Sequence, residues 1–396
     1  MDQFNVLELY SGIGGFHYAI KKLFKLKGIN NYRITGVDIN TTANEIYKHN
    51  HVGDEDKSIG NILLERNIQS ISVKELDKNR YNLITMSPPC QPFSRLGLKR
   101  DLSDNRCNSF RHLMSTLPLL ENKPEYIMLE NVKGFETSDA HQLLVETLIR
   151  CDYRFEEFLL SPTQFSIPNS RQRYYLIGRK VGTNLTSNKY KPNIHTKVPV
   201  IESNNSIFDS KSVVEYVDQI SIEEQSGLVF IGEQFQTIES YLDNKIDEQY
   251  ELNNETLLRY HMLFDLVDHN SFSTNCFTKA YAHRIEGCGS ILKAASDSVT
   301  IDDVYTLVKQ LKKQKDEQNC SSDNGNDFDD AIVQALRSLH LRYFTPREIA
   351  NLMSFPSEFE FPDKINRKQQ YRVLGNSVNV TVCYYLLRIL IGSISE

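Results

Sequence analysis

Short apolar runs alternate with turns and helix-like segments along the first 180 residues. The runs occupy residues 4–10, 32–37, 81–86, 126–129, 155–160 and 174–177, with a weaker strand-like fragment at 67–71. Each is too short for a helix, whereas helix-like segments occupy 16–26, 107–120 and 139–150. Strands that alternate with helices predict an α/β class, a Rossmann-like fold with a mixed, mostly parallel sheet and helices on both faces.

The pattern loses this regularity after residue 180. Residues 181–256 and 313–333 are rich in Asn, Ser, Asp and Glu and read as linkers or inserts, with an apolar, glycine-bearing island at 275–290 between them. Order returns where Thr345 is expected to cap a helix that opens with Pro346, and the chain closes with an apolar helix to Ile391. We therefore expect one domain from residues 1–190 and 341–396 and a smaller lobe from 191–340, with inserts at about 203–257 and 315–330.

Composition narrows the class of protein. The 396 residues are 40% hydrophobic and 24% charged, as in ordinary soluble domains. No apolar run approaches about 18 residues and the start lacks the features of an export signal, so we expect neither export nor a membrane span. The seven cysteines form no Cys-x-x-Cys pair, which argues against a disulfide framework and a zinc ribbon. A reducing compartment, cytoplasm or nucleus, fits best.

Charge is distributed unevenly along the chain. The net charge is −6, but residues 201–259 alone hold 13 Asp and Glu against 3 Lys and Arg, which is typical of a solvated insert. Positive charge gathers in two other groups: Arg95, Lys99, Arg100, Arg106 and Arg111, and then Lys364, Arg367, Lys368 and Arg372. Each group is compatible with a solvated face, but we expect at least one to contact phosphate.

A proline-rich segment, Ser87-Pro88-Pro89-Cys90-Gln91-Pro92-Phe93, directly follows the run at 81–86. Its three prolines exclude a regular element, so Cys90 is expected on a stiff loop at the carboxyl end of a strand. Open α/β sheets bind ligands at that end, which makes Cys90 a candidate nucleophile. The alternative is a buried cysteine that acts only as a small hydrophobe.

A glycine-rich turn, Ser11-Gly12-Ile13-Gly14-Gly15, joins the first strand to the first helix. It departs from Gly-x-Gly-x-x-Gly, so a pyrophosphate ligand and a nicotinamide-dependent dehydrogenase are not indicated. Asp38 ends the second strand 24 residues after Gly14, near the spacing of an acid that accepts hydrogen bonds from ribose hydroxyls. The alternative is that Asp38 caps the helix that begins at Thr41.

Two later strands also carry candidate chemistry. Glu130 follows a strand, so Asp38, Cys90 and Glu130 are expected at a common rim, although a single acid there is often a cap or an ion-pair partner. Alternation places Arg171 and Arg173 on the same side of another strand. Their planar cations suit a base carbonyl or a phosphate, whereas arginines beside an edge strand are often merely exposed.

Taken together, these segments resemble the cytosine-5 methyltransferase superfamily over nearly the whole chain. The glycine turn, Pro-Pro-Cys-Gln, Glu-Asn-Val, Arg-Gln-Arg and the terminal Gly-Asn-Ser-Val stand in that family's order. Within it the sequence most resembles the eukaryotic tRNA-aspartate cytosine-5 methyltransferases, historically called DNA methyltransferase homologue 2. The stretches that carry this likeness are 7–15, 87–93, 130–135, 167–171 and above all Cys276-Phe277-Thr278-Lys279-Ala280-Tyr281. The acidic and Asn-rich inserts depart from the family.

The resemblance implies S-adenosylmethionine as methyl donor and no metal. The residues that it assigns to the donor are Tyr10, Ser11, Gly12, Ile13, Gly14, Gly15, Asp38, Ile39, Ile68, Gln69, Ser87, Asn376, Ser377 and Val378. A sulfonium ligand carries no pyrophosphate, which agrees with the missing third glycine.

The chemistry of this reaction explains the remaining motifs. Carbon 5 of cytosine is too weak a nucleophile until a thiolate adds at carbon 6, the role assigned to Cys90. Glu130 would hydrogen-bond N3 and the 4-amino group, while Arg171 and Arg173 would hold the base carbonyl and a neighbouring phosphate. The base that removes the carbon-5 proton is not assigned.

The resemblance further implies tRNA as substrate, with cytosine 38 in the anticodon loop of tRNA-Asp favoured, and residues 191–340 as a target-recognition domain. A loop exposes its bases at less cost than a duplex. The expected substrate contacts are Gln91, Arg95, Cys276, Lys279 and Lys368. We favour packing or RNA contact over covalent chemistry for Cys276, and we expect a monomer with at most weak DNA binding. The alternatives are a DNA cytosine-5 methyltransferase and a silent nucleic-acid-binding relative.

Overall fold

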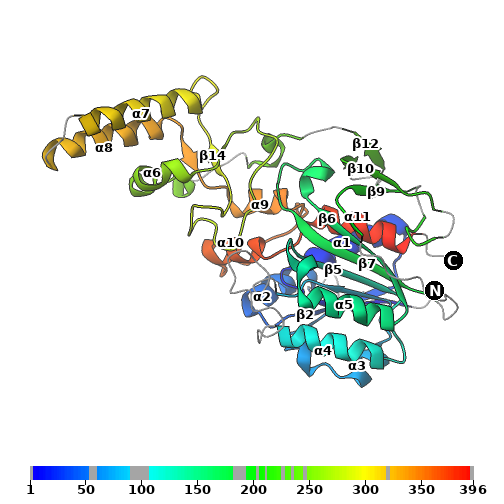
Figure 1. Ribbon diagram of the computed structural model, residues 1–396. Helices are drawn as coiled ribbons and strands as arrows, with labels where there is room; N and C mark the ends of the chain where they lie inside the picture. The colour runs from blue at the N-terminus through cyan, green and yellow to red at the C-terminus, as the bar shows by residue number, and fades with distance from the viewer. Residues whose placement is uncertain are drawn as a thin grey trace.

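The computed structural model describes residues 3–52, 60–89, 107–181, 193–201, 205–209, 212–223, 228–232, 236–243, 248–317 and 322–392. A single eight-stranded sheet forms its centre, with helices on both faces (Figure 1). The strands are β1 (Phe4–Leu9), β2 (Tyr32–Val37), β3 (Ile62–Leu64), β4 (Leu83–Met86), β5 (Tyr126–Val132), β6 (Tyr153–Leu160), β7 (Arg173–Lys180) and β8 (Ile194–His195).

The strand order is β3-β2-β1-β4-β5-β7-β6-β8. The five strands from β3 to β5 are parallel, and β7 runs antiparallel to both β5 and β6. The chain leaves β1 toward β2 and β3 on one side and later returns to β4 and β5 on the other, so the order reverses between β1 and β4. This arrangement confirms the predicted mixed, mostly parallel sheet and places a ligand crevice at the carboxyl ends of these strands.

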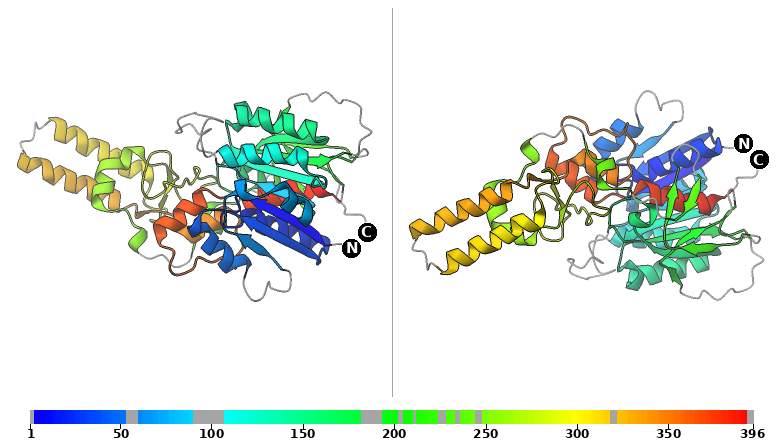
Figure 2. Two further views of the ribbon diagram at one scale, coloured as in Figure 1. Left: turned by 90° about the horizontal axis from the view of Figure 1, so that it is seen from below. Right: turned by 90° about the horizontal axis from the view of Figure 1, so that it is seen from above.

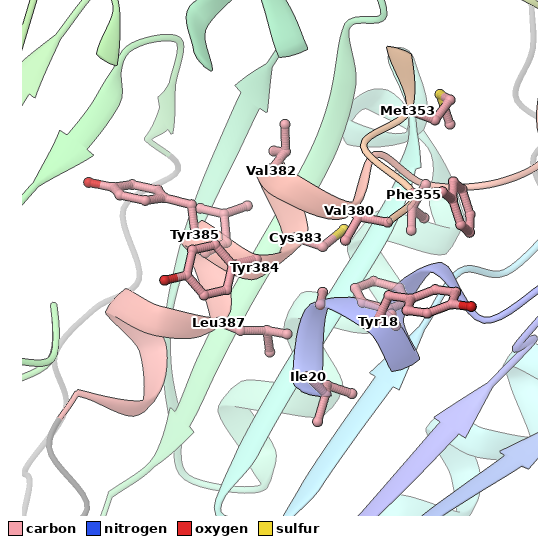
Figure 3. Packing of buried hydrophobic residues seen from close by; sticks show 14 of the residues in the cluster. Tyr18, Ile20, Met353, Phe355, Val380, Val382, Cys383, Tyr384, Tyr385 and Leu387 are labelled. Carbon is pink, nitrogen blue, oxygen red and sulfur yellow. The ribbon is translucent and has the colours of Figure 1, made fainter. Parts of the chain in front are cut away.

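Helices cover the two faces as separate groups because each apolar stripe packs on one side of the sheet. One face carries α1 (Gly15–Lys27), α2 (Thr41–His51) and α11 (Val380–Ile391), and the other carries α3 (Val73–Asn79), α4 (Asn108–Thr116) and α5 (Asp139–Arg150). Figure 3 shows α11 against α1, where Cys383 and Leu387 lie on the side of α11 toward Tyr18 and Ile20.

One stretch, Arg367–Ile391, is long and apolar enough to cross a membrane by length and composition. It comprises α10 (Arg367–Gly375) and α11 with a turn between them, and 72% of its most apolar window is buried inside the protein. Packing of α11 on α1 and β7 therefore accounts for its apolar character.

The remainder consists of short strands and an extended pair of helices. Its elements are β9 (Val198–Val200), β10 (Glu215–Val217), β11 (Ile220–Ile222), β12 (Val229–Ile231), α6 (Asn254–Tyr260), β13 (Leu266–Val267), β14 (Ile291–Lys293), α7 (Ile301–Glu317), α8 (Ser322–Arg337), β15 (Leu341–Arg342) and α9 (Pro346–Leu352). Helices α7 and α8 lie side by side as an arm that projects away from the sheet (Figures 1 and 2). A bidentate Arg342–Glu348 pair, buried on both sides, joins β15 to α9.

Several predictions about local structure were wrong. The fragment 67–71 is not a strand, because Asn67 accepts a hydrogen bond from Gln69 N and starts a 3-10 helix, η2 (Ile68–Ser70). Residues 313–333 are largely helical, since α7 and α8 bury apolar residues against each other and against α6. The described parts of 181–256 contain β8 to β12, and Ile207 and Ile220 belong to the main core. Thr345 does cap α9, as predicted.

Candidate active site

A cavity of about 470 Å³ opens at the carboxyl ends of β1, β2, β4 and β5, where the strand order reverses. Every residue assigned to the donor lines it except Gly14. Glu130, Arg171 and Arg173 line the same cavity, so the structure brings the donor residues and these three together. Its size suits a ligand of a few hundred daltons.

The Asp38 side chain is held at this cavity by two backbone donors. Gly12 N donates to Oδ2 at 2.9 Å and Asn40 N donates to Oδ1 at 2.8 Å. The N-cap of α2 is Asn40, whose side chain accepts from Ala43 N, so the alternative that Asp38 caps this helix is wrong. Asp38 thus orders the glycine turn while its half-buried carboxylate faces the cavity.

The glycine turn itself leaves room and polar groups for a ligand. Ser11 is buried and its hydroxyl has no hydrogen-bond partner among the described residues, which is costly unless a ligand supplies one. A Cβ at Gly15 would lie 2.6 Å from Val378 Cγ2, so the absence of a side chain lets the late turn at Ser377 and Val378 close over the first helix. An orphaned hydroxyl, a fixed carboxylate and an apolar wall fit a ligand that carries a ribose.

Gly14 lies on the other side of the turn, away from the cavity. Its φ of 83° is left-handed, and an added Cβ would lie 2.1 Å from Nε2 of His51. His51 is fully buried and stacked on His17, with 3.9 Å between the ring centroids. Gly14 is therefore required by packing behind the turn rather than by the ligand.

Glu130 lies within β5, one strand over from β4, and not after its end. Its carboxylate accepts from Ser87 Oγ at 2.8 Å and lies 3.5 Å from Arg173 Nε, with the residue only 5% exposed. The neighbouring Asn131 donates from Nδ2 to Pro88 O at 3.4 Å and so ties β5 to the chain that leads to Cys90. Cys90, Gln91 and Arg95 lie outside the described residues.

Arg171 is buried and joins three segments of the chain. Nη1 donates to Cys276 Sγ and Phe277 O, both at 3.2 Å. Nη2 donates to Gly375 O at 3.1 Å and to Ser377 O at 2.6 Å. These bonds to protein atoms favour a positioning role for Arg171 over direct contact with a base. Because β7 lies between β5 and β6, the alternative of arginines beside an edge strand is wrong.

Cys276 does not line the cavity but contacts both arginines that do. Its sulfur is 3.2 Å from Arg171 Nη1 and 3.6 Å from Arg173 Nη2. Burial raises the pKa of the Cys276 thiol, but the two guanidinium groups outweigh burial and leave that pKa below its ordinary value. Burial likewise opposes the charge of Arg173, yet Cys276 and Glu130 together raise the pKa of Arg173.

The other expected substrate contacts lie outside the cavity. Lys279 and Lys368 are exposed and do not line it. A Cβ at Gly375 would lie 2.2 Å from Lys279 N, so the backbone of the Cys276–Tyr281 island packs directly on the end of α10. Several residues that line the cavity were not predicted from the sequence, among them Phe16, Asn40, Arg66, Ser109 and Asn131. Asn131 stood beside Glu130 in a quoted motif, but Ser109 belongs to no motif and only the fold brings it to the site.

Comparison with known proteins shows which family this chain belongs to. The family model described as C-5 cytosine-specific DNA methylase matches residues 4–391, almost the whole chain. The chain belongs to this family. A C-5 cytosine methylase of this kind transfers a methyl group to carbon 5 of cytosine, so the protein is a cytosine-5 methyltransferase.

Full-length relatives support the same assignment. The methylase is 38% identical to the tRNA (cytosine(38)-C(5))-methyltransferase of Rattus norvegicus, over 98% of this chain and 100% of the rat protein. It is 36% identical to the DNA (cytosine-5)-methyltransferase of Dictyostelium discoideum, over 100% of this chain and 96% of that protein. The crystal structure of a Spodoptera frugiperda DNMT2 mutant matches with a TM-score of 0.73 and 36% identity, over 98% and 99% of the two chains, which confirms the fold.

Proposed function

We propose that this methylase uses S-adenosylmethionine to methylate cytosine 38 in the anticodon loop of a tRNA, with tRNA-Asp as the favoured substrate. The observation that carries the proposal is the position of Glu130. Its carboxylate shares one cavity with Asp38 and lies beside the Ser87–Pro89 segment that leads to Cys90. A donor site and a carboxylate for the base therefore lie beside Pro89, the residue that precedes Cys90 in the sequence.

The cavity residues fit the donor in three places. Asp38 offers carboxylate oxygens to ribose hydroxyls, Ser11 offers an unused hydroxyl, and Ile68 with Val378 offers apolar surface. When bound, the donor supplies a methyl group on a sulfonium centre. The proposed task of these residues is to orient that group toward the base and to exclude water.

Glu130 and Arg173 would stabilise the activated base. Glu130 is nearly excluded from solvent and held by Ser87 and Arg173, so its carboxylate is pre-oriented for N3 and the 4-amino group of cytosine. In the proposed mechanism Cys90 adds to carbon 6, carbon 5 accepts the methyl group, loss of the carbon-5 proton follows, and elimination releases Cys90.

The preference for tRNA is supported by the names of the relatives. The rat protein and its counterparts from Homo sapiens, Spodoptera frugiperda and Schizosaccharomyces pombe carry tRNA (cytosine(38)-C(5))-methyltransferase as their name. The Cys276–Tyr281 island, which carried this resemblance in the sequence, contacts the site through Arg171. A loop cytosine is also unstacked at lower cost than a paired one.

DNA remains the second candidate, because the Dictyostelium discoideum relative is named as a DNA (cytosine-5)-methyltransferase at comparable identity and coverage. One experiment separates the two substrates. Purified protein is incubated with methyl-labelled S-adenosylmethionine and either tRNA or duplex DNA, and the modified cytosine is mapped. We expect label at cytosine 38 of tRNA-Asp, and faster labelling of DNA would reverse the assignment.

Trapping tests the covalent step. A tRNA-Asp that carries 5-fluorocytosine at position 38 blocks the final elimination. The elimination requires removal of a proton from carbon 5, and the fluorine that replaces this hydrogen cannot be removed by a base. We expect a stable adduct with wild-type protein and none with Cys90→Ala. A crosslink that forms through another residue would refute the assignment of the nucleophile.

A further inference from the structure

Tyr10 adopts a backbone conformation that is rare for its type. Its φ is 56°, in the left-handed region that disfavours bulky L-residues. It follows the last residue of β1 and is the first residue of the turn that lines the cavity. Such strain persists only where surrounding contacts fix it, and it concentrates at functional sites.

The contact that fixes the Tyr10 side chain comes from α4. Tyr10 Oη donates to Ser109 Oγ at 2.9 Å, and both residues line the cavity. Burial raises the pKa of the Tyr10 hydroxyl, so it remains a proton donor over the whole working range. Ser109 lies in the first turn of α4 and has no role in the motifs that the sequence showed.

Helix α4 also contacts a second segment at the cavity, the end of η2. His112, one turn after Ser109, has its Nε2 2.9 Å from the carbonyl of Ile71, the residue that ends η2. Ile68 and Gln69 of η2 line the cavity. A single helix thus contacts both the glycine turn, through Ser109, and the segment expected at the adenine end, through His112.

We propose that Tyr10 and Ser109 form a positioning pair that couples the glycine turn to α4 and so sets the affinity for the methyl donor. This inference rests on the proposed donor. The hydrogen bond holds Tyr10 in its strained conformation, and that conformation turns Ser11 and Gly12 toward the ligand. Loss of the bond frees the turn to relax, which costs donor affinity while leaving the tRNA surface intact.

Calorimetric titration with S-adenosylmethionine and with its product S-adenosylhomocysteine tests the pair. The variants are Tyr10→Phe, Ser109→Ala and their combination, which keep the ring and the helix. We expect each single variant to bind about 3–10-fold more weakly, the loss of one hydrogen bond, and the double variant to bind no more weakly than the singles. The KM for tRNA should stay unchanged while the KM for the donor rises.

Ser115→Ala is the matched control. Ser115 is an exposed serine of the same helix, and its hydroxyl donates to His112 O at 2.8 Å within the helix. We expect wild-type donor affinity from this variant. Additive losses in the double variant, unchanged affinity in the singles, or lower melting temperatures without an affinity change would each overturn the pair. If wild-type protein binds neither compound, the proposed donor itself fails; if it binds them and the variants do so equally, only the pair fails.

Discussion

Arg171 donates from Nη2 to the backbone carbonyl of Ser377 at 2.6 Å, across more than 200 residues of sequence. The same guanidinium also donates to Phe277 O. One side chain therefore joins the Cys276–Tyr281 island and the turn at Ser377 to the segment that leads into β7. A buried cation with fixed planar geometry does this better than a flexible ammonium. Arg171 therefore positions Gly375 and Ser377, which line the cavity, and anchors the island beside them.

Arg171→Lys should loosen this junction. We expect the free energy of unfolding to fall by about 2–4 kcal/mol, since several charge-assisted hydrogen bonds are lost, and donor affinity to fall about tenfold. Urea unfolding and calorimetry measure the two effects. The control is Arg179→Lys on β7, the strand that begins two residues after Arg171, where pairs with the exposed carboxylates of Glu125 and Asp209 contribute little. If Arg171→Lys loses no more unfolding free energy and donor affinity than Arg179→Lys does, the proposed positioning role of Arg171 is refuted.

Gly14→Ala should disturb the donor turn because the new Cβ meets His51 Nε2 at 2.1 Å. We expect donor affinity to drop at least about tenfold as the turn shifts. His51→Ala in the same chain removes the obstructing ring and should restore part of that affinity, although the strain of a positive φ remains. Donor titration of the two single variants and the double variant measures this rescue.

Gly28→Ala gives the matched control for that pair. Gly28 ends the same helix with a φ of 65°, but nothing lies within 4 Å of its added Cβ. It should lose some stability through backbone strain and keep its donor affinity. A double variant at Gly14 and His51 that binds no better than Gly14→Ala alone would argue against the steric explanation.

Glu8 should make stability depend on pH. It is fully buried on β1, where burial raises its pKa to about 8 despite hydrogen bonds from Tyr47 Oη and His17 N. A carboxyl with a raised folded pKa binds more protons in the folded than in the unfolded state, so its contribution to stability falls as pH rises from about 4.5 toward 8. The neighbouring His17 and His51 have lowered pKa values and act in the opposite direction, but only below about 6.5.

Urea unfolding at pH 6.5 and pH 8 isolates the carboxyl. Between these values we expect Glu8 to cost the wild type roughly 1–2 kcal/mol of unfolding free energy. Glu8→Gln carries no titrating proton, so the difference between the two pH values should shrink by that amount. An unchanged difference would show that Glu8 ionises normally.

Glu130→Gln should slow methylation without weakening donor binding. If Glu130 hydrogen-bonds the activated base, removal of its charge should lower the rate about 10²–10⁴-fold. Single-turnover assays with labelled donor measure the rate, and calorimetry measures the affinity. Glu125→Gln is the control, since Glu125 immediately precedes the same strand, is exposed and contacts Arg179 rather than the cavity. Full activity in Glu130→Gln would remove Glu130 from the chemistry.

Local periodicity was sufficient for much of the fold. The apolar runs predicted the central strands, and β2 was predicted to the residue because polar residues flank it, Asn30 and Asn31 before it and Asp38 after it. The prediction missed where polar sequence folds through packing partners. Helices α7 and α8 are polar over most of their surface, and their stability comes from a shared apolar seam that only their pairing creates.

In the candidate site, too, local sequence predicted some features and packing decided the others. The sequence by itself predicted that Asp38, Glu130 and the glycine turn share one site, because each belongs to a contiguous motif at or near the carboxyl end of a strand. Only the tertiary structure decided that Arg171 binds the carbonyl of Ser377 and that His51 packs against Gly14. It also decided that Ser109 accepts a hydrogen bond from Tyr10. Each of these contacts joins segments that are far apart in the chain. No local pattern encodes such a distance, since it is set by how helices and strands pack over the whole sheet.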